Sequence, residues 1–278
     1  MVAVDYDRAY SDVIDLLEDR PKSKNPICFK MHKTTNENLT AILGQFDFEG
    51  KEVLSVLSSS DQMMSSYYLG AENVDTFDNN VTPYLFYYLK KWCMQYTGKS
   101  YLSASNRELL DCLDLHQNND IENNVALFWK RVLIRINVPL THSALFYTNF
   151  SDSYGVPYSE DIAKMNELMK DRDPNYSRLD LFDEQDIERQ YDYIILSNIL
   201  EYAYEEDDAR IYRNIMRNIH GALKDDGVVI CSSLIFEKIL ESGYFEEMFD
   251  THDGAYEYEE HRRRYKPISY SYTKKRRP

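Results

Sequence analysis

Hydrophobic positions recur along the chain with two different spacings, and each spacing predicts one kind of element. Short apolar runs between polar residues predict strands at residues 52–57, 73–77, 178–182, 193–197, 228–232 and 265–275. Apolar residues three or four positions apart predict helices at residues 6–19, 36–46, 81–94, 160–170 and 206–223. Strands and helices alternate through most of the chain. This order predicts an α/β fold with a Rossmann-like, doubly wound, mostly parallel sheet and helices on both faces.

Several residues predict where these helices begin and end. Asn36 is a plausible N-cap for the helix at 36–46, and Pro83 lies in the first turn of its helix, where proline is tolerated. Gly227 follows Lys224-Asp225-Asp226 and predicts the end of the helix at 206–223.

One helical stretch does not alternate with strands. The segment at about residues 97–150, which contains NNVALFWKRVLIRI, predicts a helical insertion after the second strand. We therefore expect an N-terminal helical segment or lid at residues 1–48 and a main domain at residues 49–278.

The stretch VLSVLSSSDQMMSSYYLGAENVDTFDNN, residues 53–80, has the pattern of a nucleotide-binding strand–turn–helix–strand unit, but its turn lacks glycine. The turn residues Ser58, Ser59, Ser60, Asp61 and Gln62 are candidate cofactor ligands, because serine hydroxyls, backbone N–H groups and a helix N-terminus converge there. Asp61 suits a ligand ammonium group and a helix cap equally well. The alternative is an ordinary strand–helix turn capped by serine.

A candidate ribose ligand ends the second strand. Asp78 lies 20 residues after Ser58, where an acid accepts two hydrogen bonds from a ribose diol. Asn79 and Asn80 follow and are candidate ligands as well; the alternative is a simple Asp-Asn-Asn turn. The absence of G-x-G-x-x-G argues against a dinucleotide site.

Two later strand ends supply further candidates. Asp180 or Asp183 could reach an adenine amino group, although acids are equally common in loops. Ser197 and Asn198 end the strand in YDYIILSNILEY and would reach the rim of the same crevice, or else cap the following helix.

The net charge and the composition limit the kinds of molecule that the protein is expected to bind. The net charge of −15 does not suit a broad double-stranded nucleic-acid footprint, and 24 tyrosines indicate amphipathic surfaces. Basic clusters at residues 261–264 and 274–277 predict a solvated tail, with contact to phosphate-rich partners or an anionic lipid surface as the alternative.

Cysteine and histidine spacing exclude other classes of site. The four cysteines lie far apart without a C-x-x-C pair, which fits a reducing cytoplasm rather than structural zinc or disulfides. The six histidines have no metal-binding partner at i+3 or i+4, so no metal site is expected. The first residues lack the apolar core of a signal peptide, and no apolar run is long enough to span a bilayer. Spacing assigns no catalytic base, and oligomeric state is not readable.

The order of strand, polar loop, helix and strand-acid, followed by YDYIILSNILEY and LKDDGVVICSS, resembles class I S-adenosylmethionine-dependent methyltransferases. The resemblance implies that the first loop holds the methionine part of the cofactor, that the acid after the second strand holds the ribose, and that the fourth strand lines the reacting centre.

A narrower resemblance covers about residues 34–235. TNENLTAIL, GKEVLSVLSSSDQMMSSYYLGAENVDTFDNN and Phe128-Trp129 resemble the DUF3419 group, which is related to a betaine-lipid enzyme that transfers an aminocarboxypropyl group from S-adenosylmethionine. The resemblance implies that residues 35–38 form part of a lid. Ser60 stands where the group usually has glycine, and Asn79 where it usually has isoleucine; a serine there could crowd a ligand or strain the turn.

Three functions follow from these patterns. The first is methyl transfer from S-adenosylmethionine to a small-molecule or polar metabolite acceptor, which needs proximity more than acid–base groups. The second is transfer of the aminocarboxypropyl arm of the same cofactor. The third is a non-catalytic cofactor-binding or interaction module, suggested by Ser60 and the acidic, tyrosine-rich composition.

Overall fold

The structure is a computed structural model that describes residues 3–21, 25–33, 35, 37–98, 100–115, 119–147, 155–183, 187–200, 202, 209–233, 249–257 and 268–274. Its elements, in chain order, are α1 (Tyr6–Leu17), α2 (Leu39–Leu43), β1 (Glu52–Val56), α3 (Asp61–Tyr68), β2 (Asn73–Phe77), α4 (Thr82–Thr97), η1 (Tyr101–Ser103), α5 (Asn106–Leu115), α6 (Asp120–Arg135), η2 (Leu140–His142), η3 (Pro157–Glu160), α7 (Ile162–Met169), β3 (Asn175–Ser177), β4 (Tyr191–Ser197), α9 (Ala209–Ala222), β5 (Leu223–Ser233), β6 (Phe249–Glu257) and β7 (Ile268–Lys274).

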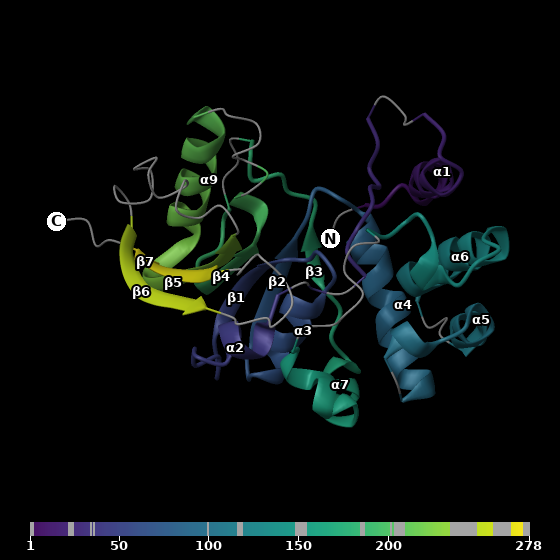
Figure 1. Ribbon diagram of the computed structural model, residues 1–278, viewed down its shortest axis with the longest axis horizontal. Helices are drawn as coiled ribbons and strands as arrows, with labels where there is room; N and C mark the ends of the chain where they lie inside the picture. The colour runs from purple at the N-terminus through teal and green to yellow at the C-terminus, as the bar shows by residue number, and fades with distance from the viewer. Residues whose placement is uncertain are drawn as a thin grey trace.

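The described strands form one sheet in the order β3-β2-β1-β4-β5-β7-β6 (Figure 1). The first five pair in parallel, whereas β7 is antiparallel to both β5 and β6. The chain runs outward from β1 through β2 to β3 and then returns to place β4 on the other side of β1. This reversal creates a topological switch point between β1 and β4, where ligands of such sheets bind. The predicted fold class, a doubly wound and mostly parallel α/β sheet with a helical insertion after the second strand, is confirmed.

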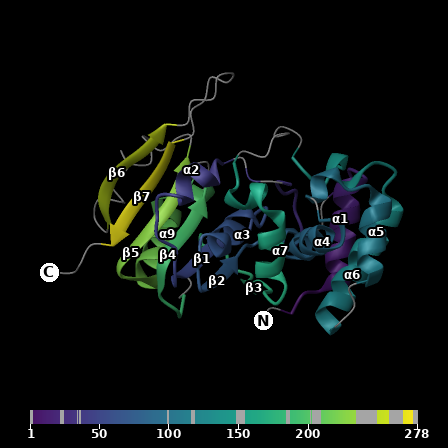
Figure 2. The same ribbon diagram turned by 90° about the horizontal axis from the view of Figure 1, so that it is seen from below.

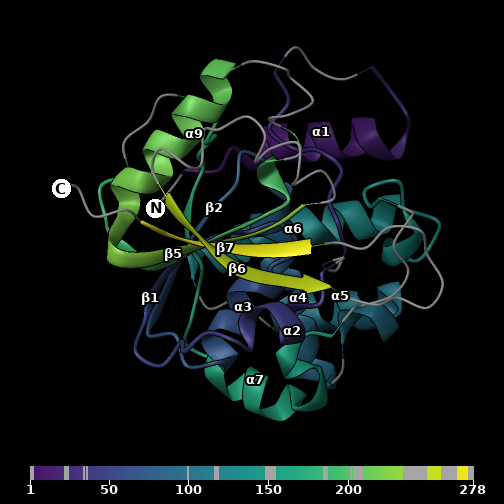
Figure 3. The ribbon, with the colours of Figure 1, turned by 60° about the vertical axis from the view of Figure 1, so that its left-hand side comes forward.

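Both faces of the sheet are covered, which explains why β1 after Glu52 is apolar on both faces, apart from the buried Ser55, rather than alternating. Val53 packs into the core cluster that contains Met63 of α3, and Leu54 packs into the cluster that contains Ile215 of α9. Figure 3 shows α9 on one side of the sheet and α3 and α7 on the other. A parallel strand buried on both faces has no solvent-facing position to mark with a polar residue.

A helical layer lies beyond the β3 edge of the sheet. Helices α1, α5 and α6 gather at the end of the molecule opposite β6 and β7 (Figure 2). The indole N–H of Trp129, on α6, donates to the backbone oxygen of Leu85, on α4, at 2.7 Å, and both side chains are buried. This bond joins the predicted insertion to the first helix of the β2–β3 connection. The division of the chain at residue 48 stays a prediction.

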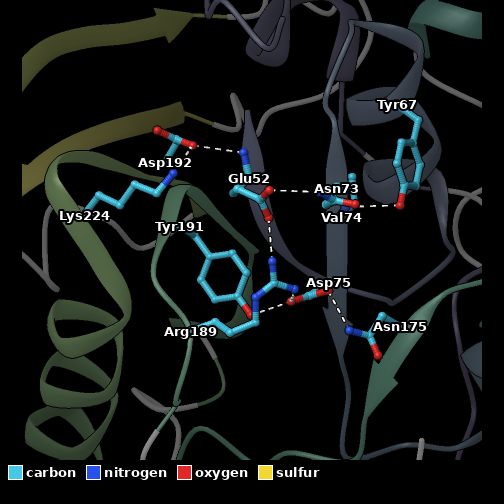
Figure 4. A network of polar contacts seen from close by, with 10 residues as sticks. All are labelled: Glu52, Tyr67, Asn73, Val74, Asp75, Asn175, Arg189, Tyr191, Asp192 and Lys224. Atoms are coloured by element: carbon cyan, nitrogen blue, oxygen red, sulfur yellow. Dashed lines mark hydrogen bonds and ion pairs between the residues drawn. The ribbon is translucent and has the colours of Figure 1, made fainter. Parts of the chain in front are cut away.

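A polar network ties together the amino ends of the parallel strands (Figure 4). Asp75 on β2 accepts from Arg189 at 2.6 Å, from Tyr191 at 2.7 Å and from the Asn175 amide on β3 at 2.8 Å. Arg189 also donates to Glu52 on β1 at 2.7 Å. These contacts lie at the end of the sheet opposite the carboxyl ends of β1 and β4. They hold the amino ends of the strands together through side chains of the strands and of Arg189.

Two predicted boundaries are wrong for local reasons. The cap of α2 is Asn38, whose side chain accepts from Ala41 N, whereas Asn36 lies outside the described residues. The strand expected at 178–182 is a turn instead, because Asp180 accepts from Phe182 N at 3.0 Å and from Asp183 N at 3.2 Å. The apolar alternation there reflects burial of Leu181 against the α9 side of the sheet.

Gly227 does not end a helix. Helix α9 ends at Ala222, and β5 begins at the next residue and includes Gly227. The pairing of β5 with β4 shifts from Tyr191–Leu223 to Tyr193–Val228, so the strand bulges between these pairs. A Cβ at Gly227 would meet Lys224 O and Tyr191 O at 3.0 Å, which explains the glycine.

Strand β6 was not predicted, whereas β7 confirms the strand expected at 265–275.

The described helices include none with both the length and the apolar character needed to cross a bilayer.

Candidate functional site

A cavity of about 420 Å³ opens at the carboxyl ends of β1, β2 and β4, beside the switch point. The cavity brings together seven residues that the sequence predicted as ligands: Ser58, Asp78, Asn79, Asn80, Asp180, Ser197 and Asn198. Four other predicted ligands, Ser59, Ser60, Asp61 and Gln62, are buried and do not line it, and neither does Asp183, the alternative to Asp180.

Asp78 is fixed by the backbone of two neighbouring segments. Its Oδ2 accepts from Ser58 N at 3.0 Å, and its Oδ1 accepts from Asn80 N at 2.9 Å. Burial raises the pKa of this carboxyl to about 6, Asp180 adds to the rise, and the two N–H donors act against it. Each carboxylate oxygen keeps a second lone pair, so Asp78 can still accept both hydrogens of a diol.

Asn79 and Asp180 form the next part of the wall. The Asn79 amide donates to Asp180 Oδ2 at 3.1 Å, which joins the loop after β2 to the loop after β3. Leu179, Leu181 and Phe182 line the cavity beside them. This part of the cavity therefore combines apolar surface with one carboxylate, a combination that suits a flat heterocycle with an amino group.

Two residues of the serine turn have left-handed backbone angles. The φ of Ser58 is +43° and the φ of Ser60 is +69°, and Ser60 N donates to Leu57 O at 2.6 Å. The Ser60 hydroxyl is fully buried and has no hydrogen-bond partner among the described residues. Ser60 therefore combines backbone strain with an unsatisfied buried group, and glycine would avoid both. Ser60 does not line the cavity. Of the two effects predicted for a serine here, the strained turn is confirmed by the φ of +69°, and crowding of a ligand stays a prediction.

The carboxylate of Asp61 is fully engaged by other parts of the protein. Its Oδ2 accepts from Thr35 N at 2.7 Å and from Ser59 Oγ at 2.8 Å. Its Oδ1 accepts from the Lys90 ammonium and the Tyr158 hydroxyl. Because a carboxylate has about four acceptor positions, Asp61 has none left for a ligand ammonium.

Gln62 and Ser197 meet at Glu37, which belongs to the N-terminal segment. Glu37 Oε2 accepts from Gln62 Nε2 at 2.9 Å, and Glu37 Oε1 accepts from Ser197 Oγ at 2.9 Å. Ser197 has a φ of +55° and lines the cavity, so it is a third strained residue at these strand ends. Glu37 is buried directly behind Ser197.

A further part of the cavity wall comes from Tyr147 and from residues 29–32, which belong to the predicted N-terminal segment or lid at residues 1–48. Met31 pairs with Phe146 in an isolated parallel bridge, and both side chains enter the core. The next residue on each segment, His32 and Tyr147, lines the cavity, and their ring centroids are 4.9 Å apart. Burial lowers the pKa of His32, so the imidazole is neutral at neutral pH.

Asn80 anchors this wall to the sheet. Its Oδ1 accepts from Phe29 N at 3.0 Å, and its Nδ2 donates to Phe29 O at 3.3 Å. Asn80 therefore holds residues 29–32 of the N-terminal segment in place as well as lining the cavity. The sequence did not identify His32 and Tyr147 as lining residues, because Met31 and Phe146 are paired across more than a hundred residues of chain.

Within the described ranges, no three His, Cys, Asp or Glu side chains are grouped so that they could hold a metal ion.

No protein-family model matches this chain, and no curated protein sequence matches it. The resemblance to the DUF3419 group therefore stays a prediction.

Solved structures with a similar arrangement include several methyltransferases. The ribosomal protein L11 methylase from Lactobacillus delbrueckii subsp. bulgaricus is 14% identical and covers 90% of this chain and 82% of its own, with a TM-score of 0.43. The N-methyltransferase NodS from Bradyrhizobium japonicum WM9, in complex with S-adenosyl-L-homocysteine, is 7% identical and covers 96% and 98%, with a TM-score of 0.42. A TehB-like S-adenosylmethionine-dependent methyltransferase from Corynebacterium glutamicum is 12% identical and covers 87% and 89%, with a TM-score of 0.42. Similarity at this level does not identify a reaction.

Proposed function

We propose that this protein is an S-adenosylmethionine-dependent transferase, and that it transfers the methyl group to a small-molecule or polar metabolite acceptor. The observation that supports this most is the position of Asp78. It directly follows β2, lines the cavity at the switch point and keeps acceptor positions for a diol.

The cavity suits the separate parts of this cofactor. Asp78 would hold the ribose hydroxyls, and the surface formed by Asn79, Asp180 and Phe182 would hold the adenine. The methionine arm would extend past Ser58 toward Ser197 at the end of β4. A glycine-poor turn is compatible with this cofactor, because no pyrophosphate has to approach the backbone closely.

The reaction needs positioning more than acid–base groups. The cofactor supplies an activated methyl group on a sulfonium, so the protein has to hold the acceptor in line with it and exclude water. His32 and Tyr147, which line the same cavity, would contact the acceptor. A neutral His32 could take the proton that an amine or hydroxyl acceptor releases.

Mass spectrometry of ligand released from the purified protein tests the proposal. We expect S-adenosylmethionine or S-adenosylhomocysteine from the natural protein and neither from Asp78→Ala. A dinucleotide or an unrelated metabolite at stoichiometric level would contradict the proposal.

The products formed from S-adenosylmethionine separate methyl transfer from transfer of the aminocarboxypropyl arm. Methyl transfer leaves S-adenosylhomocysteine, whereas transfer of the arm leaves 5′-methylthioadenosine. The two reactions use the same cavity, so product analysis in a cell extract that supplies acceptors decides between them.

A further inference from the structure

Glu37 and Ser197 come from segments far apart in the sequence and meet behind the cavity wall. Ser197 Oγ lies 2.9 Å from Glu37 Oε1 and 3.5 Å from Asn198 Oδ1. The shorter contact is the favoured one for its single hydrogen, so the hydroxyl donates toward Glu37. A hydroxyl that donates its hydrogen inward leaves both lone pairs as acceptors. Since Ser197 lines the cavity, it can accept a hydrogen bond from a bound ligand.

The Glu37 carboxylate accepts hydrogen bonds from the side chains of Gln62, Ser197 and Thr35. A ligand donor bonded to Ser197 Oγ would lie within about 6 Å of Glu37 Oε1, given an ordinary hydrogen-bond length. At that distance, in a mostly buried site, a carboxylate attracts a cation strongly.

An acceptor beside Glu37 also lacks a donor. The side-chain amide of Gln62 points its Nε2 toward Glu37, to which it donates. Gln62 Oε1 therefore points away from Glu37. Gln62 is 1% exposed, and its Oε1 has no hydrogen-bond partner among the described residues. Gln62 does not line the cavity, so this unsatisfied acceptor belongs to the buried interior and is separate from the acceptor that Ser197 Oγ presents to a ligand.

The acid that the sequence suggested for a ligand cation is already neutralised. Asp61 pairs with the buried Lys90, which also donates to Ser59 O at 3.0 Å. The positive charge of Lys90 thus takes the place that a ligand ammonium would have had beside Asp61. Glu37 is a second carboxylate near the cavity. It accepts from Gln62 and from the cavity residue Ser197.

We infer that Glu37 acts through Ser197 as the positioning residue for the ammonium group of the cofactor's amino-acid arm. The inference rests on the proposed function, because it concerns the same cavity. It assigns a binding role to the N-terminal segment, which lies outside the strand–turn–helix unit at residues 53–80. An ammonium group supplies N–H donors, which a sulfonium lacks, so the ammonium is the better partner for the acceptor Ser197 Oγ.

Two commercial ligands separate this role from a purely structural one. S-adenosylhomocysteine carries the amino-acid arm, whereas 5′-methylthioadenosine has the same nucleoside without the arm. We expect Glu37→Gln to weaken binding of S-adenosylhomocysteine by about tenfold to a hundredfold in calorimetric titrations. Binding of 5′-methylthioadenosine should change by less than about twofold, because its contacts lie at Asp78.

Ser197→Ala gives a second measurement that keeps the carboxylate in place. It should also weaken S-adenosylhomocysteine more than 5′-methylthioadenosine. Asp75→Asn is the matched control, because it alters a buried carboxylate at the opposite end of the sheet. It should leave the ratio of the two affinities unchanged, even if it lowers the unfolding temperature.

Several results would overturn the inference. Equal weakening of both ligands by Glu37→Gln would indicate a structural role, and tighter binding of S-adenosylhomocysteine would mean that its carboxylate faces Glu37. Weakening of S-adenosylmethionine alone would mean that the sulfonium is the group recognised. If the natural protein binds neither nucleoside, the proposed function itself fails and this inference fails with it. If it binds both equally well and Glu37→Gln changes nothing, only the inference fails.

Discussion

The carboxylate of Asp78 accepts a hydrogen bond from the backbone N–H of Ser58 at 3.0 Å, which joins the end of β2 to the turn after β1. The bond holds the serine turn and the candidate ribose ligand in one fixed arrangement at the cavity. A turn without glycine can therefore still present an ordered ligand site, because the neighbouring acid orients it.

Asp78→Asn should weaken binding of S-adenosylhomocysteine by about tenfold to a hundredfold. Hydrogen bonds to a charged group contribute about 1.5–3 kcal/mol, and the amide accepts from a diol with only one oxygen. Calorimetric titration measures the change. Asp75→Asn, on the same strand but away from the cavity, is the control, and a similar loss in that variant would contradict a direct role for Asp78.

Ligand affinity should depend on pH through the same residue. Burial raises the pKa of Asp78 to about 6, whereas the ordinary value is 3.8. The ionised form is the better diol acceptor, so affinity for 5′-methylthioadenosine should fall about fourfold from about pH 7.5 to about pH 5.5. Asp78→Asn should show no such fall. A flat profile in the natural protein would contradict the assignment.

The same raised pKa affects the free energy of unfolding. Lower pH weakens ligand binding, but it stabilises the folded protein through this residue. The folded protein holds the Asp78 proton more tightly than the unfolded chain does. The ionised carboxyl therefore opposes folding above about pH 6, and this cost disappears as the pH falls toward about 4. Urea unfolding of the natural protein and Asp78→Asn at several pH values measures the effect. The difference between the two should shrink as the pH falls.

Ser60→Gly should raise the free energy of unfolding by about 1 kcal/mol. Glycine removes the cost of a left-handed φ of +69° and the buried hydroxyl without a partner, and these gains exceed the added flexibility of the unfolded chain. Urea unfolding measures the change. Ser60→Ala removes the hydroxyl but keeps the strain, so it should gain less than Ser60→Gly. A destabilised Ser60→Gly variant would show that the serine side chain has a stabilising contact.

Lys90→Met should lower the free energy of unfolding by about 3–5 kcal/mol, because it leaves the buried Asp61 carboxylate without its cation. Chemical unfolding measures the loss. The double variant Lys90→Met/Asp61→Asn should recover part of it, since no uncompensated charge is left. If the double variant is less stable than Lys90→Met alone, the ion pair is not the main role of these two residues.

Local sequence patterns were sufficient for the elements that hold the cofactor loop. The bounds of β2 were predicted as the structure has them, and β1 differs by one residue. Both strands lie between polar turns, and apolar or β-branched residues fill most of their positions: Val53, Leu54 and Val56 in β1, and Val74, Thr76 and Phe77 in β2. Asp78 could be placed because the end of a parallel strand determines which edge of the sheet its next residue reaches.

The remaining features depend on contacts between distant parts of the chain. Nothing near Asp61 shows that Lys90 takes up its charge, since the two meet only when α4 packs behind the serine turn. The wall that carries His32 exists because Met31 pairs with Phe146. Gly227 had the signature of a helix end, but the close approach of Tyr191 O and Lys224 O in a bulged strand is what requires it.

Titration of S-adenosylmethionine into the natural protein, followed by thermal unfolding, tests the central claim that this cavity binds the cofactor through Asp78. At a hundredfold excess over the dissociation constant, binding should stabilise the natural protein by about 2.7 kcal/mol. The same concentration should stabilise Asp78→Asn much less. An unchanged unfolding curve of the natural protein up to millimolar cofactor would contradict the account, as would equal stabilisation of both proteins.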